Sequence, residues 1–399
     1  MDERRTLSAL PAKKIAIALA VIAALCGGIC PGAEAQGNAP GSISLPTELR
    51  VQKPGWWPTK GDAVRDEFVG TAACAQCHAS KADTYPSMSM AHAGFPAADS
   101  ERLHQHGHLA FELGRYGYQI AANGENSILS VTDGTSTLSR TLIWAFGFAH
   151  MGQTYIYEQN GSLYESHVSF YAGPQALDIT PGQSHAIPVS LEEAAGRRME
   201  PSEVRLCFGC HTTASTTKNE FDARNLFPGV TCEACHGPGA RHVLARETGT
   251  EEEGAAFILN PGRLSPVESV DFCGACHRTW EDVVKNGLIG LGVFNVRFAP
   301  YRLENSRCWG TGDARITCTA CHDPHKPLVT DVHSYDAYCR RCHILRGAKR
   351  TRDHPGADCR VSTENCVTCH MPKYEPPGLH SAFTDHWIRI VQPGKPYPN

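Results

Sequence analysis

Residues 229–242 read Gly-Val-Thr-Cys-Glu-Ala-Cys-His-Gly-Pro-Gly-Ala-Arg-His, and the Cys-x-x-Cys-His at their centre decides how the chain folds. This five-residue pattern occurs seven times and uses fourteen of the eighteen cysteines. It is typical of covalent attachment of c-type haem. The copies, called motifs 1 to 7 from here on, are Cys74/Cys77/His78, Cys207/Cys210/His211, Cys232/Cys235/His236, Cys273/Cys276/His277, Cys318/Cys321/His322, Cys339/Cys342/His343 and Cys366/Cys369/His370.

The spacing within each motif explains the choice of cofactor. Two thiols three residues apart reach the two vinyl groups on one edge of a porphyrin, and the next residue then lies under the iron, where imidazole is the usual ligand. We therefore predict seven haem c groups. The alternative is zinc, since Cys321 and Cys339 have the spacing of a zinc ribbon. A zinc ribbon, however, needs no histidine directly after its second cysteine.

Histidines are more numerous than the seven motifs require. Of twenty in the chain, thirteen lie outside the motifs, which favours two histidines on each iron. His242 and His325 follow their own motifs too closely to fold back over them, so we expect each to bind a neighbouring iron. The predicted second ligands are His242, His325, His333, His380 and His386.

The first haem has two candidate second ligands, because Met90 and His92 both follow motif 1 closely. Methionine would raise the reduction potential relative to a second histidine, and we favour His92. The seventh second ligand is left open among His108, His150 and His354. An iron without a second protein ligand is also compatible with the sequence.

The N-terminal residues predict export. Residues 1–35 combine basic residues, an apolar run too short to span a bilayer (Ile15–Leu25) and an Ala-x-Ala cleavage site, as in a secretory signal. We therefore predict a periplasmic protein, with an extracellular or outer-membrane-associated location as the alternative. Membrane contact would come only through the signal or a partner. Disulfides are permitted there, so the unassigned Cys308 and Cys359 are predicted to form one.

Composition narrows the class of protein. The chain is 399 residues long, 41% hydrophobic and 20% charged, so most of it should fold. Its formal net charge of -4 and the lack of a basic domain argue against nucleic acid as a partner.

The chain divides into five segments by composition. These are the signal (1–35), a Gly/Pro/Ser-rich linker (36–66), the first haem segment (67–95), a β-rich insert (96–190) and a six-haem domain (191–399). Alternating polarity predicts strands at 116–121, 128–132, 154–158 and 162–170, with turns at 123–124, 133–134 and 160–161. A short helix is predicted at 191–198. The fold class is thus α+β with little regular structure: short helices and irregular loops wrapped on haems, and an antiparallel β insert.

Several stretches around the motifs resemble multihaem cytochromes c of the cytochrome c-552/c-554 type. They cover roughly residues 67–390 and include 68–70, 90–92, 229–239, 271–280, 318–325, 366–373 and 383–389. The resemblance implies periplasmic electron transfer and supports His386 as an iron ligand. The long β insert departs from the compact arrangement of that family.

The predicted function is electron relay between redox partners, with other redox proteins or a membrane quinol oxidase as donor or acceptor. No catalytic residue is assigned. Two alternatives remain. One is an oxidoreductase acting on a small nitrogen or sulfur oxyanion at an open haem. The other is a subunit of a polymeric haem filament.

Overall fold

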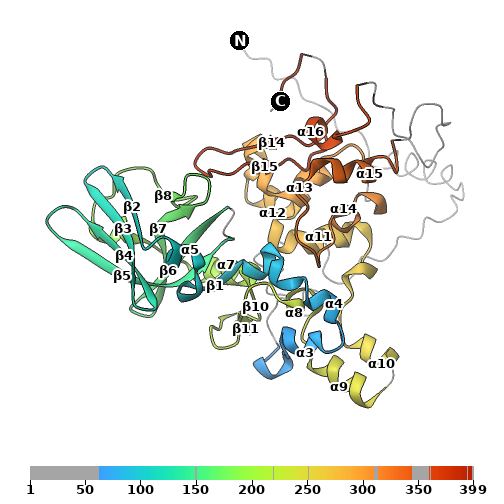
Figure 1. Ribbon diagram of the computed structural model, residues 1–399, viewed down its shortest axis with the longest axis horizontal. Coiled ribbons are helices and arrows are strands. Elements are labelled where there is room, and N and C mark those ends of the chain that lie inside the picture. The colour runs from blue at the N-terminus through green and yellow to red at the C-terminus, as the bar shows by residue number, and fades with distance from the viewer. Residues whose placement is uncertain are drawn as a thin grey trace, which may run out of the picture. The chain divides into compact units, whose positions relative to one another are not determined.

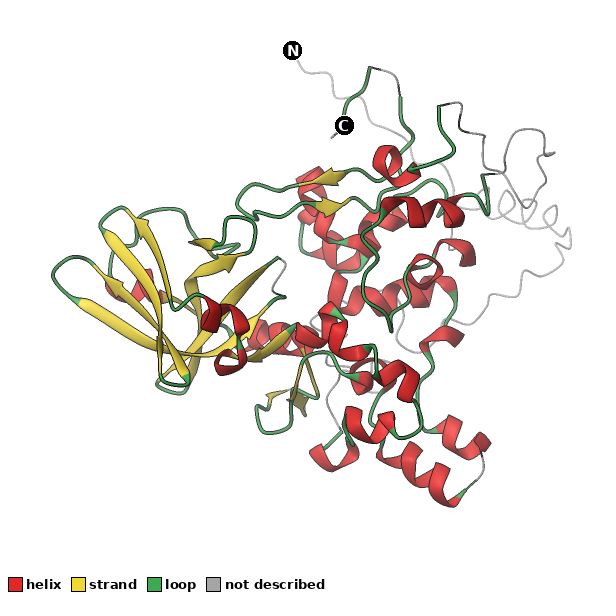
Figure 2. Ribbon diagram, viewed as in Figure 1, coloured by secondary structure: helices red, strands yellow, loops and turns green. Residues whose placement is uncertain are grey.

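Short helices and one large antiparallel sheet make up the protein, seen here in a computed structural model (Figures 1 and 2). It describes residues 63–148, 151–218, 220–249, 251–309, 313–343, 359, 361–392 and 394–397. They belong to one compact unit. The predicted signal, the linker up to residue 62, and His150 and His354 lie outside the described residues.

The large sheet has nine strands and is built mainly from consecutive hairpins, in the order β2-β3-β4-β5-β6-β7-β8. It curls until β8 contacts β2. Two short strands join it from the side: β1 pairs with β5, and β9 pairs with β7. The strands are β1 (Gly94–Pro96), β2 (His108–Leu113), β3 (Tyr116–Asn123), β4 (Asn126–Thr132), β5 (Thr137–Phe146), β6 (Gly152–Gln159), β7 (Ser162–Tyr171), β8 (Ala176–Ile179) and β9 (Gly196–Arg198).

The sheet has an apolar core of its own, because one face of each strand turns inward. In β3 the alternate residues Tyr116, Tyr118 and Ile120 are buried, and Leu129 and Val131 of β4 are their neighbours in the same core. Alternation of this kind is expected where a strand has one buried face. The sheet therefore needs no cofactor to fill its interior.

Four predicted strands are confirmed as β3, β4, β6 and β7, each within a few residues of its expected bounds. The helix predicted at 191–198 is only half right. It ends at Ala195, and residues 196–198 form β9 instead. Gly196 explains the change, since a Cβ added at this position would collide with the carbonyl oxygen of Glu165 on β7. Only glycine permits so close an approach of two backbones.

The helices are short and most of them carry or adjoin a motif. They are α3 (Thr71–Ala75), α4 (Ala79–Ala82), α5 (Glu101–Gln105), α6 (Leu191–Ala195), α7 (Pro201–His211), α8 (Cys232–His236), α9 (Ala240–Thr248), α10 (Glu251–Ala256), α11 (Pro266–His277), α12 (Trp280–Lys285), α13 (Ala299–Glu304), α14 (Cys318–Cys321), α15 (Asp336–Cys339) and α16 (Cys366–His370). Three two-stranded ladders lie among them: β10–β13 (Thr212–Thr213, Phe227–Pro228), β11–β12 (Thr216–Thr217, Glu220–Phe221) and β14–β15 (Lys373–Tyr374, Phe383–Thr384).

An aromatic cluster joins the sheet to α7, the helix that carries motif 2. Phe208, fully buried, packs edge-on against Trp144 and Phe146 of β5, with ring centroids 5.2 and 4.9 Å away. Phe221 of β12 covers Phe208 at 4.3 Å. The position of motif 2 is thus set by the end of the sheet.

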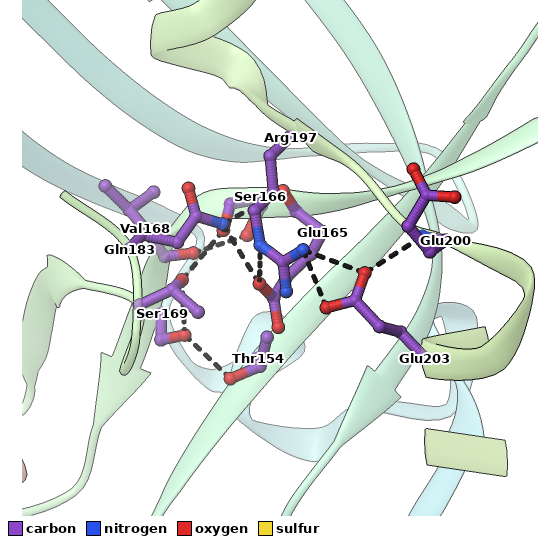
Figure 3. A network of polar contacts seen from close by, with 10 residues as sticks. Thr154, Glu165, Ser166, Val168, Ser169, Gln183, Arg197, Glu200 and Glu203 are labelled. Atoms are coloured by element: carbon purple, nitrogen blue, oxygen red, sulfur yellow. Dashed lines mark hydrogen bonds and ion pairs between the residues drawn. The ribbon is translucent and has the colours of Figure 1, made fainter. Parts of the chain in front are cut away.

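A polar network joins the same two parts and is shown in Figure 3. Arg197 of β9 donates to Glu165 of β7 at 3.0 Å and to both carboxylate oxygens of Glu203 on α7, at 2.9 and 3.0 Å. Gln183 also donates to Glu165, at 3.2 Å. Burial raises the pKa of Glu165, while the charge of Arg197 opposes that rise.

Replacing Arg197 with methionine should make stability depend on pH. Glu165 would lose its cation, so its already raised pKa should rise further. A raised folded-state pKa stabilises the protein below the unfolded value, and this stability is lost as pH rises through the folded pKa. As pH rises from weakly acidic to neutral, the denaturation midpoint of R197M should therefore fall more than that of the unmutated protein. The double variant R197M/E165Q should lose this slope, and an unchanged slope would contradict the assignment.

Candidate haem-attachment sites

Every motif begins on a helical turn. The first cysteine lies within a helix in all seven motifs, namely α3, α7, α8, α11, α14, α15 and α16. Side chains three and four residues apart lie on one face of a helix. A helical turn therefore presents both thiols and the histidine on the same side, as attachment to one porphyrin edge requires.

The seven motifs are alike in sequence but not in structure, and four of their residues show the difference. Cys77 follows the end of α3 and is exposed, and Cys369 is exposed although it lies within α16. Cys342 and His343 both lie beyond the end of α15, where Cys342 is half-buried and His343 is exposed. The seven motifs are thus alike in sequence but differ in exposure, most clearly at Cys77, His343 and Cys369.

Motifs 1 and 6 lie on two short helices. α3 ends at Ala75 and α15 ends at Cys339, so neither continues through its motif. The backbone nevertheless completes the turn, because the N–H of His78 donates to the carbonyl of Cys74 at 2.8 Å and that of His343 to the carbonyl of Cys339 at 3.0 Å. Each histidine thus stays one turn from its first cysteine. Haem attachment stays a prediction at all seven motifs.

Motifs contact each other through their first cysteines. The Cys74 thiol (motif 1) is hydrogen-bonded to Cys232 (motif 3), which raises the pKa of Cys74 and lowers that of Cys232. The same contact joins motif 4 to motif 5 and motif 6 to motif 7. The corresponding pairs are Cys273–Cys318 and Cys339–Cys366.

Further contacts connect these pairs of motifs. The Cys210 sulfur of motif 2 lies 3.7 Å from the carbonyl oxygen of Ala275 in motif 4. Burial raises the pKa of Cys235 in motif 3, and the neighbouring Cys276 of motif 4 raises it further. Burial likewise raises the pKa of Cys321 in motif 5, and the neighbouring Cys339 of motif 6 adds to the rise. Neighbouring side chains thus place motifs 1, 3, 4, 5, 6 and 7 in one row, and motif 2 lies beside motif 4.

Three motif histidines face a second histidine. The ring centroids of His78 and His242 are 6.5 Å apart, those of His236 and His325 6.0 Å, and those of His322 and His386 6.2 Å. Two imidazoles on one metal ion have centroids about 6 Å apart, because each metal–nitrogen bond is about 2 Å long. The separations fit one iron between the two rings of each pair.

Several histidine rings are oriented by backbone carbonyls. A carbonyl only accepts, so Nδ1 donates and Nε2 is left for a metal. The donors and acceptors are His211 to Ala93 (2.8 Å), His236 to Leu259 (2.8 Å), His370 to Arg389 (2.9 Å), His242 to Gly254 (2.8 Å) and His386 to Thr384 (3.0 Å).

Burial keeps several of these imidazoles neutral, as a metal ligand must be. It lowers the pKa of His211, His277 and His322, and it lowers that of His386 to about 4. At neutral pH none of them competes for a proton. In the part of the chain that is described, no three His, Cys, Asp or Glu side chains gather closely enough to hold a metal ion by themselves. A haem iron needs only two protein ligands, because the porphyrin supplies the others.

Two predicted second ligands use Nε2 for another partner. Nε2 of His92 donates to the carbonyl of Pro86 at 2.7 Å, and its ring stacks on Phe148. Nε2 of His380 lies 2.6 Å from the carboxylate of Asp178 on β8. The structure therefore engages these two nitrogens within the protein rather than presenting them to a motif histidine.

The remaining candidates are distributed over the chain. His333 is half exposed, with its Nδ1 3.0 Å from Asp336. The backbone carbonyl of Met90 accepts a hydrogen bond from the N–H of Val230, just ahead of motif 3. His108 begins β2 and is exposed on the sheet.

The predicted disulfide between Cys308 and Cys359 is not formed. Both cysteines are free, and both are exposed.

A buried ion pair, not foreseen from the sequence, positions His386. Arg302 of α13 donates to both oxygens of Asp385, at 2.8 and 2.5 Å, and both side chains are almost fully buried. The hydroxyl of Ser306 donates to the carbonyl of His386 at 3.2 Å. An Asp-His pair in a C-terminal tail is the sequence signal that pointed to this place, but its arginine partner, 83 residues away, left no signal.

No helix within the described ranges has the length and apolarity needed to cross a membrane.

Known proteins resemble this chain in sequence and structure. Residues 163–237, which run from β7 through motifs 2 and 3, match the family "Cytochrome c554 and c-prime". Multiheme cytochrome MtrA of Shewanella baltica (strain OS185) is 24% identical over 227 residues, covering 54% of this chain and 57% of that protein. The chain thus spans little more than half the length of this curated relative. The crystal structure of outer cell wall cytochrome OcwA has 15% identity, a TM-score of 0.48, and coverage of 82% of this chain and 80% of that one. The family match and the relative confirm the resemblance to multihaem cytochromes c.

Proposed function

We propose that the chain is an exported cytochrome that carries seven haem c groups and relays electrons between redox partners. The observation that carries this proposal is the set of three histidine pairs, with ring centroids 6.0 to 6.5 Å apart and one member of each in a Cys-x-x-Cys-His motif. Haem iron supplies one-electron redox chemistry when bound.

The residues of the chain serve this function in three ways. The cysteines would tether each haem covalently. The two histidines of a pair would both bind its iron and so keep small molecules from it. Backbone carbonyls that accept from Nδ1 fix ring orientation and raise the basicity of the ligand, one of the means by which a protein tunes potential.

The row of motif contacts supports relay rather than storage at separate sites. It runs from motif 1 through motifs 3, 4, 5 and 6 to motif 7, and motif 2 joins it at motif 4. Motif 2 is also the one packed against the sheet.

The two ends of the row are the more exposed ones, which suits the entry and exit of electrons. At one end, Cys77 of motif 1 is exposed. At the other end, Cys369 of motif 7 is exposed, and so is His343 of motif 6, the preceding motif in the row. A partner docking at either end would meet a haem edge near the surface. We propose other redox proteins or a quinol oxidase as partners and the periplasm as the location.

The proposal is tested first by cofactor content. Intact mass and the pyridine haemochrome assay on the exported protein should report seven covalently bound haems. Reductive titration should then take up seven electrons per chain, and fewer or none would contradict the proposal.

Replacing His242 with alanine should open one iron. His242 faces His78, so its loss should convert one haem in seven to a high-spin form that binds carbon monoxide. His92→Ala is the matched control, because Nε2 of His92 is held by Pro86 and its removal should leave all spectra unchanged. Carbon monoxide binding in H92A but not in H242A would reverse the assignment of the second ligand of motif 1.

A further inference from the structure

A buried glutamate of motif 3 holds the start of motif 1. Glu233 lies between the two cysteines of its own motif and is 1% exposed. Its Oε1 accepts the N–H groups of Val69 at 3.0 Å and Gly239 at 2.7 Å, and its Oε2 accepts that of Gly70 at 2.8 Å. Gly70 is the N-cap of α3, which has no side-chain cap from its own segment.

A second carboxylate does the same for motifs 6 and 7. Asp336 begins α15, which carries motif 6, and is fully buried. Its two oxygens accept the N–H groups of Asn365 at 2.7 Å and Cys366 at 2.8 Å, where α16 of motif 7 begins. These two hydrogen bonds join the first residue of α15 to the start of α16.

Both carboxylates join motifs that also touch through sulfur. Glu233 links motifs 1 and 3, where Cys74 contacts Cys232, and Asp336 links motifs 6 and 7, where Cys339 contacts Cys366. Glu233 lies inside its motif, whereas Asp336 precedes its motif. The shared contact, a carboxylate that accepts N–H groups at the start of another motif helix, therefore does not come from a shared local sequence. Hydrogen bonds from backbone N–H groups to a carboxylate are short and strong, and in a buried place they fix geometry.

We propose that Glu233 and Asp336 are positioning residues that fix how the two attachment helices of a haem pair lie against each other, and thereby set electron exchange within that pair. The inference rests on the proposed function. Exchange would oxidise one centre by one electron and reduce the other by one, and the carboxylates would act only through the positions of the helices. Asp336 also lies 3.0 Å from Nδ1 of His333, so it would orient that ring as well.

The test replaces each acid by its amide in the full, haem-loaded chain. In Glu233→Gln an NH₂ group takes the place of one oxygen, so at least one of the three N–H groups loses its acceptor. Intact mass should still show seven haems. The magnetic coupling between the two ferric centres of motifs 1 and 3, read by electron paramagnetic resonance, should change, and their exchange rate should fall several-fold. Asp336→Asn should have the same effect confined to motifs 6 and 7.

Glu247→Gln is the matched control for charge, because Glu247 is exposed on α9, the helix that follows motif 3, and its replacement also removes one negative charge. A charge effect alone would raise potentials without altering magnetic coupling. Variants that carry seven haems with unmutated coupling and exchange rates, or that differ from the unmutated protein only as E247Q does, would overturn the inference.

Hydrogen exchange in the unmutated protein keeps the inference testable if a variant does not accumulate. The amides of Gly70, Gly239 and Cys366 should exchange as slowly as those inside the motif helices, and fast exchange would overturn the inference. If the unmutated protein itself lacks seven haems, the proposed function fails instead. The two failures are therefore distinct.

Discussion

Asp385→Asn should destabilise the protein by about 3–5 kcal/mol, because it leaves the guanidinium of Arg302 buried without its counter-ion. Asp385 also accepts the N–H of Trp387 and the hydroxyl of Tyr397, so the tail around His386 should loosen. We expect a lower denaturation midpoint and one haem that newly binds carbon monoxide, the one of motif 5, whose His322 faces His386.

A surface ion pair provides the comparison for this variant. Asp313 and Arg315 form one with side chains 29% and 41% exposed, and exposed pairs contribute about 1 kcal/mol or less. Asp313→Asn should therefore change stability little. The double variant R302M/D385N should be more stable than D385N, since no unpaired charge stays buried. A D385N protein as stable as D313N would show that the pair does not hold the tail.

Phe208→Ala should be comparably severe, at about 3–5 kcal/mol, the range found when a buried aromatic side chain is removed. Phe208 fills the junction of α7 with β5 and β12, so its loss leaves a cavity beside Cys207 and Cys210. Besides lowering the denaturation midpoint, the change should reduce haem attachment at motif 2, which peptide mapping can detect.

The control for Phe208 is Thr319, which occupies the same position in motif 5 but is exposed. Thr319→Ala should leave both stability and haem content unchanged. Equal losses in the two variants would mean that this motif position matters for attachment itself rather than for packing.

The sequence predicted the sheet where polarity alternates and turns are marked, and it did not identify strands whose two faces are both covered. β3 and β4 alternate clearly. At the end of β5 the residues from 142 to 146 are continuously apolar, because Leu142 and Ala145 face the core of the sheet while Phe146 packs on the other side against Phe208. A run of this kind has no period of two, so pattern alone could not assign it.

The motif cysteines and histidines could be read directly from their spacing, whereas their surroundings could not. The motifs share one pattern, yet Cys77 is exposed while Cys207 is half-buried, because burial depends on what the rest of the chain packs over each turn. Glu233 and Asp336 illustrate the same limit. An acidic residue in a sequence is usually exposed, and only the burial and the backbone N–H groups around these two reveal their place.

The predicted second histidine ligands show how much can be inferred from the spacing of histidines along the sequence. His242, His325 and His386 were selected because each follows a motif closely or lies in the tail, but which motif each one faces depends on contacts across the whole fold.

The closing of the curled sheet bears on the order in which the protein folds. The hydrogen bond from Val69 to Glu233 joins residues 164 apart, a large loop for a chain to close. Strands β2 to β8 pair with their sequence neighbours and therefore form early. Once formed, they bring β1 and β9 onto one scaffold and shorten the loop that is left to close. The β insert would thus bring motif 1 close to motif 3, although motif 3 lies much later in the chain.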